Sequence, residues 1–197
     1  MQFGAVYTQG EINAALQSDD PLHIVPHQDT DGHGTFIASV AGGRENNGHI
    51  GAAPDAAIIA VKLKPATPYY RKQFPAWPED NNNIFTSDNI MMGIDYILDQ
   101  ADAFDRPVAI CIALGSNFGG HAGLGRMEEY LTYICNRRGI VVCTAAGNES
   151  NARHHTDGVS MQVGQIRNVE ISVGQNVRGF SVYIWNEPWD KLSVAVE

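Results

Sequence analysis

The sequence predicts an α/β protein with a doubly wound, mostly parallel sheet, followed by the start of an antiparallel β insertion. Strand-like apolar runs alternate with helix-like segments up to about residue 145. Strands joined through helices lie parallel with right-handed crossovers, and the loops at their carboxyl ends are the expected site. After residue 168, short runs with a period near two follow one another without helices. We therefore expect a core over 1–167 and a β-rich insertion that begins over 168–197.

Two helices are expected before the first strand. Thr8 and Glu11 have the spacing of a capping box, and the apolar positions over 12–16 indicate a short helix behind it. Apolar residues recur at helical spacing over 33–41, and the glycine pair at 42–43 ends that pattern. A second helix is therefore predicted over 33–41.

The remaining elements follow from apolar runs and their borders. The continuous run over 56–63 lies between prolines, as expected of a buried strand, whereas 65–83 lacks periodicity and predicts a long surface loop. Helices are predicted over 88–101 and 127–138, and each is followed by a buried strand, over 107–114 and 140–145. The insertion is expected to contain strands over 169–173, 180–185 and 192–196.

The composition argues against several kinds of partner. Acidic residues number 22 against 13 basic ones, and the formal charge is −9. Because basic residues cluster at most in pairs, we expect no nucleic-acid partner. No apolar run reaches the roughly 18 residues of a membrane helix, so no membrane partner is expected. The three cysteines are an odd number in apolar or helical contexts, which favours buried thiols over disulfides.

The first chemical motif places a histidine between two glycines where a helix is expected to begin. His33 lies in the run Asp-Thr-Asp-Gly-His-Gly-Thr over 29–35. Flanking glycines allow another chain to approach closely, and imidazole is the side chain that most often activates a hydroxyl. From this motif alone a solvated or capping histidine is the more common interpretation, and a catalytic base is the alternative.

The second motif follows a predicted strand. Asn148 ends the run Thr-Ala-Ala-Gly-Asn over 144–148, so it should emerge at the carboxyl edge of the sheet. A side-chain amide at that edge can donate to a developing oxyanion. For a Gly-Asn pair taken alone, an ordinary asparagine in a turn is the more common interpretation, and the oxyanion donor is the alternative.

Four segments in this order resemble the subtilisin-like serine proteases. His33-Gly34-Thr35 is similar to the family's histidine motif, 51–56 to the turn and strand that follow it, 113–115 to the strand edge that pairs with substrate, and 145–148 to the oxyanion segment. The resemblance implies peptide-bond hydrolysis by a Ser-His-Asp triad. It makes His33 the base, Asn148 the oxyanion donor, and Ala113, Leu114 and Gly115 the substrate-binding edge.

The chain most resembles a clostridial branch of the family that includes the germination-specific spore proteases. The resemblance places the aspartate strand just before Met1, the nucleophilic serine beyond Glu197, and a β-sandwich insertion between Asn148 and that serine. Separately from the resemblance, the first 16 residues lack the pattern of a signal peptide, which slightly favours a cytoplasmic or spore-associated location over a secreted one.

The departures from the family pattern define what this chain is expected to do alone. It contains neither a Gly-Thr-Ser-like serine motif nor a strand ending in aspartate before His33. Asp29 and Asp31 enter the predicted helix and are interpreted as solvated or helix N-terminal charges, and Ser116 and Ser150 as loop serines. We therefore predict that these residues alone are inactive. The alternative function is an inactive pseudoprotease or a peptide-binding module.

No metal or cofactor is expected. The loop over 44–50 is too short to wrap calcium, and the adjacent pair His154-His155 has no flanking ligand cluster. The glycines over 115–125 fit no nucleotide-binding register and are better explained by backbone access for a peptide. The expected partners are a peptide or protein substrate and the protease's own propeptide.

The aromatic loop over 65–83 is a further candidate for substrate binding. It contains four aromatic residues, among them Tyr70 and Trp77, which predict contact with a bound peptide. The alternatives are a lid that packs on the domain, or a nicking site at Arg71-Lys72.

Overall fold

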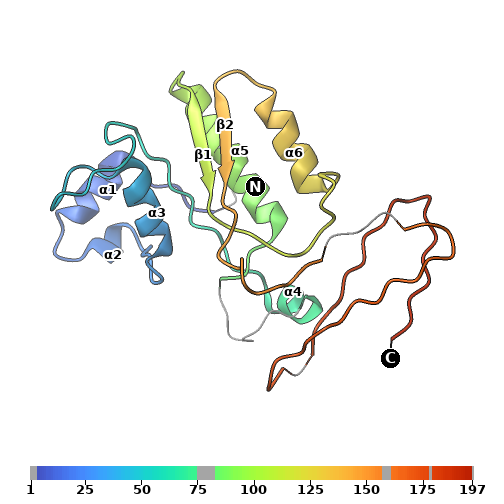
Figure 1. Cartoon of the computed structure of the whole chain (residues 1–197). Coiled ribbons are helices and arrows are strands. Elements are labelled where there is room, and N and C mark those ends of the chain that lie inside the picture. The colour runs from blue at the N-terminus through green and yellow to red at the C-terminus, as the bar shows by residue number, and fades with distance from the viewer. Residues whose placement is uncertain (1–3, 75–82, 157–160, 178, 197) are drawn as a thin grey trace. The chain divides into compact units, whose positions relative to one another are not determined.

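The computed structural model describes residues 4–74, 83–156, 161–177 and 179–196 (Figure 1). The chain forms two compact units, Met1–Ala60 and Val61–Glu197. The described part of the first unit contains the helices α1 (Gln9–Leu16), α2 (Pro21–Ile24) and α3 (His33–Gly42). That of the second contains, in order, α4 (Pro68–Gln73), α5 (Ser87–Ala103), β1 (Val108–Ile112), α6 (Arg126–Cys135) and β2 (Ile140–Thr144).

The predicted capping box begins α1. The Thr8 N–H donates to Glu11 Oε2 at 2.7 Å, and the Glu11 N–H donates to Thr8 Oγ1 at 3.3 Å. These two bonds occupy donors that a helix N-terminus otherwise leaves without a partner. The prediction of a short helix at this point is confirmed.

The carboxyl end of α3 is closed by the segment that follows it. The Ala52 N–H donates to Val40 O at 3.0 Å, and the Ala53 N–H donates to Ala41 O at 2.8 Å. The preceding Gly51 passes so close that an added Cβ would lie 2.5 Å from a backbone nitrogen at this end of the helix. The Gly-Ala-Ala stretch thus satisfies carbonyls that a helix C-terminus leaves free.

The second unit is built on one pair of parallel strands. β1 and β2 pair with Ile110 opposite Val142, and α6 forms the connection between them. α5 and α6 pack on this pair, and their apolar faces meet it in a buried core of Ile94, Leu98, Ile110 and Ile134. The predicted α/β character and these predicted helices and strands are confirmed. Of the helices in the described ranges, none has the length and apolarity that a membrane crossing requires.

The cysteines were expected to be buried, and that prediction is wrong. Cys111 and Cys143 face each other in the strand register and are exposed, as is Cys135. The strand period of two explains the pair, because Ile110 and Val142 turn toward the core and the cysteines beside them turn away from it.

Two predicted features before β1 differ from the structure. No strand is assigned over 56–63: the residues there are mostly exposed and pair with no neighbouring strand in the described ranges. Within the predicted loop 65–83, α4 begins with Pro68 at its first position, where proline's fixed φ suits a helix start.

The predicted strands over 169–173, 180–185 and 192–196 are also absent from the described residues. The chain there is extended between three turns (Figure 1), and its backbone hydrogen bonds in the described part are the turn bonds at 162–165, 174–177 and 187–190. A strand needs a hydrogen-bonded neighbour, which these segments lack. The proposed domain boundary at 167/168 stays a prediction. The two compact units of the chain meet between Ala60 and Val61.

Candidate active site

His33 is the first residue of α3 and is exposed. The N-cap is Gly32, with φ of +88°, a left-handed conformation that glycine adopts without steric cost. The His33 N–H donates to Asp31 Oδ1 at 3.2 Å. The local sequence therefore fixes the backbone of His33 while leaving its imidazole open to solvent.

The Asp29 carboxylate organises the loop that leads into α3. It accepts hydrogen bonds from the backbone N–H groups of Asp31, Gly32 and Thr35 and from the Thr35 hydroxyl. The Thr35 hydroxyl contributes most, followed by the Gly32 N–H, to holding the pKa of Asp29 far below its ordinary value of 3.8. The interpretation of Asp29 as a helix N-terminal charge is confirmed. Residues 29–35, which comprise this loop and the first three residues of α3, are called the Asp29 loop from here on.

Asn148 lies just beyond β2 and is exposed. Gly147, directly before it, has φ of +78°, so the chain turns sharply after the strand. The next turn is closed by the Ala152 N–H, which donates to Glu149 O at 2.9 Å. The Asn148 amide is thus presented at the carboxyl end of a parallel strand, as predicted.

A polar group that the sequence analysis missed holds the loop after Asn148. Asn117 Nδ2 donates to Glu149 Oε2 at 2.8 Å, and His154 Nδ1 lies 3.0 Å from the same oxygen. The Asn117 amide and then His154 lower the pKa of Glu149 from its ordinary 4.5. These three residues are called the Glu149 clasp. The sequence signal for this contact is the position of the two residues. Asn117 follows β1 and Glu149 follows β2, so both lie at the edge where the carboxyl ends of these parallel strands meet.

The predicted substrate edge directly follows β1. Ala113 and Leu114 are half-buried, whereas Gly115 is exposed, and a Cβ added to Gly115 would meet no atom within 4 Å. Backbone with such free space beside it can accept an extended peptide. The Glu149 clasp joins the loop after this edge to the loop of Asn148.

The aromatic predictions fall on α4 and its surroundings. Tyr70 lies in α4 with 46% of its surface exposed and packs edge-on against Tyr69, with ring centroids 5.7 Å apart. Trp77 lies outside the described residues. An aromatic group of the second unit surrounds Phe118, whose ring centroid lies 5.8 Å from Phe74, 5.0 Å from Tyr183 and 6.4 Å from Trp185.

The residues considered for metal binding form no such centre in the described part of the chain. No group of three or more histidine, cysteine, aspartate or glutamate side chains there could hold an ion. His154 takes part in the Glu149 clasp, and the His155 ring packs edge-on against His121, with centroids 6.0 Å apart.

The structure describes the two halves of the predicted site separately. His33 belongs to the first unit, whereas Asn148, the 113–115 edge and Tyr70 belong to the second. The first unit thus presents an exposed imidazole at the start of a helix, and the second presents an exposed side-chain amide beyond a parallel strand.

Comparison with known proteins identifies the family to which this chain belongs. The model of the subtilase family matches residues 8–178, and the chain belongs to this family. It is 32% identical over 126 residues to thermitase of Thermoactinomyces vulgaris, covering 63% of this chain and 36% of thermitase. It is also 32% identical over 122 residues to a subtilisin of Bacillus sp. (strain TA39), covering 61% and 24% of the two chains.

A solved structure supports the same assignment. The CspB protease of Clostridium perfringens matches with a TM-score of 0.65 and 33% identity. The match covers 77% of this chain and 30% of the protease. This chain therefore spans about a third or less of the length of each of these relatives.

Proposed function

We propose that the natural protein is a serine endopeptidase of the subtilisin type. His33 acts as general base and then as general acid, and the Asn148 amide stabilises the oxyanion of the tetrahedral intermediate. The observation that carries the proposal is the presentation, in a subtilase chain, of an exposed imidazole at the first residue of α3 and an amide at the end of β2.

The remaining chemistry is proposed to come from residues outside the 197. The sequence contains no Gly-Thr-Ser-like segment, and Asp29 is occupied by its own loop rather than by His33. We propose that a nucleophilic serine and a triad aspartate come from flanking sequence, and that β1 and β2 belong to a larger, doubly wound sheet. These 197 residues by themselves are inactive under this proposal.

The proposed substrate is an extended peptide that lies along Ala113, Leu114 and Gly115. Main-chain hydrogen bonds to this edge give affinity, and apolar surface beside it accommodates side chains. Phe118, three residues after the edge, and Tyr70 on α4 supply that surface. The same edge would hold the protease's own propeptide.

Peptide hydrolysis by the natural protein tests the catalytic assignment. His33→Ala should lower kcat by on the order of a million-fold, because the members of a triad act as a unit. His23→Ala is the matched control, since His23 is an exposed histidine of α2 in the same unit. Equal rates for the two variants would refute the role of His33.

The aromatic assignment is tested by combining Tyr70→Ala with Trp77→Ala in the natural protein. KM for long peptides should rise, because distal side chains lose contact area, while small ester substrates serve as the internal control. Unchanged peptide kinetics would leave a lid or the nicking site as the explanation of this loop.

A further inference from the structure

We propose that Asp29 is a positioning residue for His33. Its carboxylate fixes the loop from which the imidazole projects and never touches the substrate. The catalytic consequence rests on the proposed function, whereas the geometry of the Asp29 loop can be tested without it.

The hydrogen bonds of Asp29 use both of its oxygens. Oδ1 accepts from the N–H groups of Asp31 at 3.1 Å and Gly32 at 2.8 Å. Oδ2 accepts from the Thr35 N–H at 2.9 Å and from the Thr35 hydroxyl at 2.6 Å. An ionised carboxylate has about four acceptor positions, so this group is close to saturated. The donors lie on both sides of His33 in the sequence.

This arrangement replaces an ordinary N-cap. The N-cap residue of a helix usually accepts from the N–H of the third helical residue, but Gly32 has no side chain with which to do so. Thr35 is the third residue of α3, and its N–H donates to Asp29 instead. The negative charge also lies at the positive end of the helix dipole.

The glycine and the carboxylate are therefore coupled. Gly32 supplies the left-handed backbone that brings His33 to the surface, and Asp29 holds that conformation from outside the helix. Without the carboxylate, the N–H groups of Gly32 and Thr35 lose their acceptor, and the start of α3 can fray into alternative conformations. The imidazole would then spend less time in the geometry that proton transfer requires.

Asp29→Asn in the natural protein tests this inference. The variant keeps the shape of the side chain but replaces one carboxylate oxygen with an amide NH2 group. This new donor would then face N–H and O–H donors that have lost their acceptor. We expect kcat to fall by about 10²-fold, the scale of a misplaced catalytic group, with KM within twofold of the wild type. KM should hold because the proposed substrate edge lies in the second unit.

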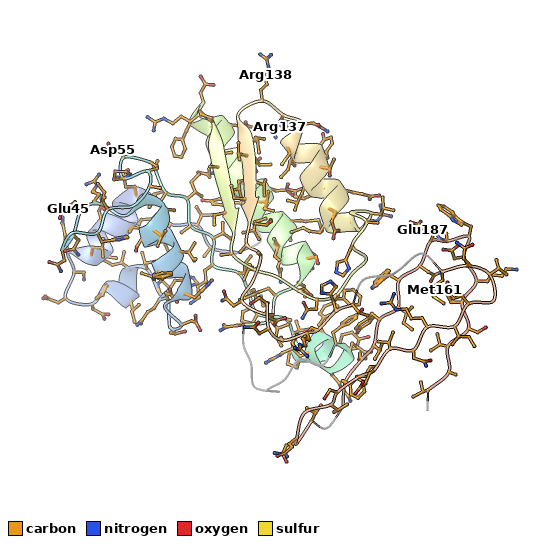
Figure 2. The ribbon with its side chains drawn as sticks, viewed as in Figure 1. Glu45, Asp55, Arg137, Arg138, Met161 and Glu187 are labelled. Carbon is orange, nitrogen blue, oxygen red and sulfur yellow. The ribbon has the colours of Figure 1, made fainter. Side chains whose placement is uncertain are left out.

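Asp55→Asn is the matched control. Asp55 is an exposed aspartate of the first unit, in the segment that follows α3 (Figure 2). The kcat and KM of the Asp55→Asn variant should equal those of the wild type. A role limited to helix stability would lower the melting temperature of Asp29→Asn and leave kcat unchanged at temperatures well below melting.

Thr35 provides a second variant series in case Asp29→Asn does not fold. Thr35→Val removes the hydroxyl bond at nearly constant shape and should lower kcat by less than Asp29→Asn does. Thr35→Ser restores the hydroxyl and should recover the wild-type rate. Equal rates for Thr35→Val and Thr35→Ser would contradict the inference.

A measurement on this chain alone separates the inference from the proposed function. The backbone amide signals of Gly32 and Thr35 should shift in NMR spectra of Asp29→Asn and stay in place in Asp55→Asn. If the wild-type natural protein cleaves no peptide, the proposed function fails while these signals still report on Asp29. If it cleaves peptides and Asp29→Asn retains kcat within twofold, the inference is overturned.

Discussion

The two loops that carry the site residues are held by carboxylates in different ways. Asp29 takes all its donors from residues 31–35, and three of the four are backbone N–H groups. Glu149 takes side-chain donors, and Asn117 lies 32 residues away in the sequence. The first loop is thus organised by local sequence, whereas the second requires β1 and β2 to be paired first.

This difference has a consequence for stability. A bond between near neighbours forms whenever the local backbone folds, but the Glu149 clasp forms only if the sheet brings two loops together. Damage to the core of the second unit should therefore open the clasp and spare the Asp29 loop.

The largest expected effect comes from Ile110→Ala. Ile110 is 3% exposed in the core beneath β1, and truncating a buried isoleucine typically lowers the free energy of unfolding by about 2 to 5 kcal/mol. In a denaturant titration followed by NMR, the Asn117 side-chain amide should lose its native chemical shift at a lower denaturant concentration than the backbone amides of Gly32 and Thr35 do. Simultaneous loss of all three signals would contradict the distinction between the two loops.

A second pair of variants ranks the residues of the oxyanion loop. In the natural protein, Asn148→Ala should lower kcat by about 10² to 10³, as removal of an oxyanion donor typically does. Asn117→Ala should lower kcat by less, because it loosens the Glu149 clasp but leaves the donor in place. Asn136→Ala, an exposed asparagine at the end of α6, is the control. An Asn117→Ala loss as large as that of Asn148→Ala would show that the clasp is part of the donor site itself.

The smallest of the three expected effects comes from lowering the pH, which should protonate Glu149 before Asp29. Both pKa values are lowered in the folded protein, so each group stabilises the fold above its ordinary pKa and loses that contribution as the pH falls through the folded value. Glu149 starts from 4.5 and Asp29 from 3.8, and Asp29 is lowered further. The Asn117 amide signal should therefore change at higher pH than those of Gly32 and Thr35, and the reverse order would refute the comparison.

The same division explains how much of the structure the sequence predicts. The capping box at Thr8, the start of α3 and the α5–β1–α6–β2 succession depend on local patterns, and all of them form as predicted. The run over 56–63 has a strand-like composition, but a strand also requires a partner, and no residue pattern within the run specifies one. Proline at the first position is typical of a helix start, and the prediction of a loop over 65–83 did not take Pro68 into account.

The site follows the same rule. Gly32, His33 and Asn148 are recognisable from short motifs, because their conformations depend on adjacent residues. Asn117 was not recognised, because a lone asparagine in a glycine-rich loop gains its meaning only from Glu149 in another loop. The exposure of Cys111 and Cys143 likewise depends on which face of the strands the helices cover.

Labelling with a serine-directed fluorophosphonate shows whether the natural protein is a serine peptidase whose nucleophile lies outside these 197 residues. The natural protein, purified with its own termini, should be modified at one serine that lies outside these 197 residues, and His33→Ala should abolish the modification. The 197-residue chain alone should remain unmodified, including at Ser116 and Ser150. Stoichiometric labelling of the isolated chain, or no labelling of the natural protein, would refute the proposed serine peptidase mechanism.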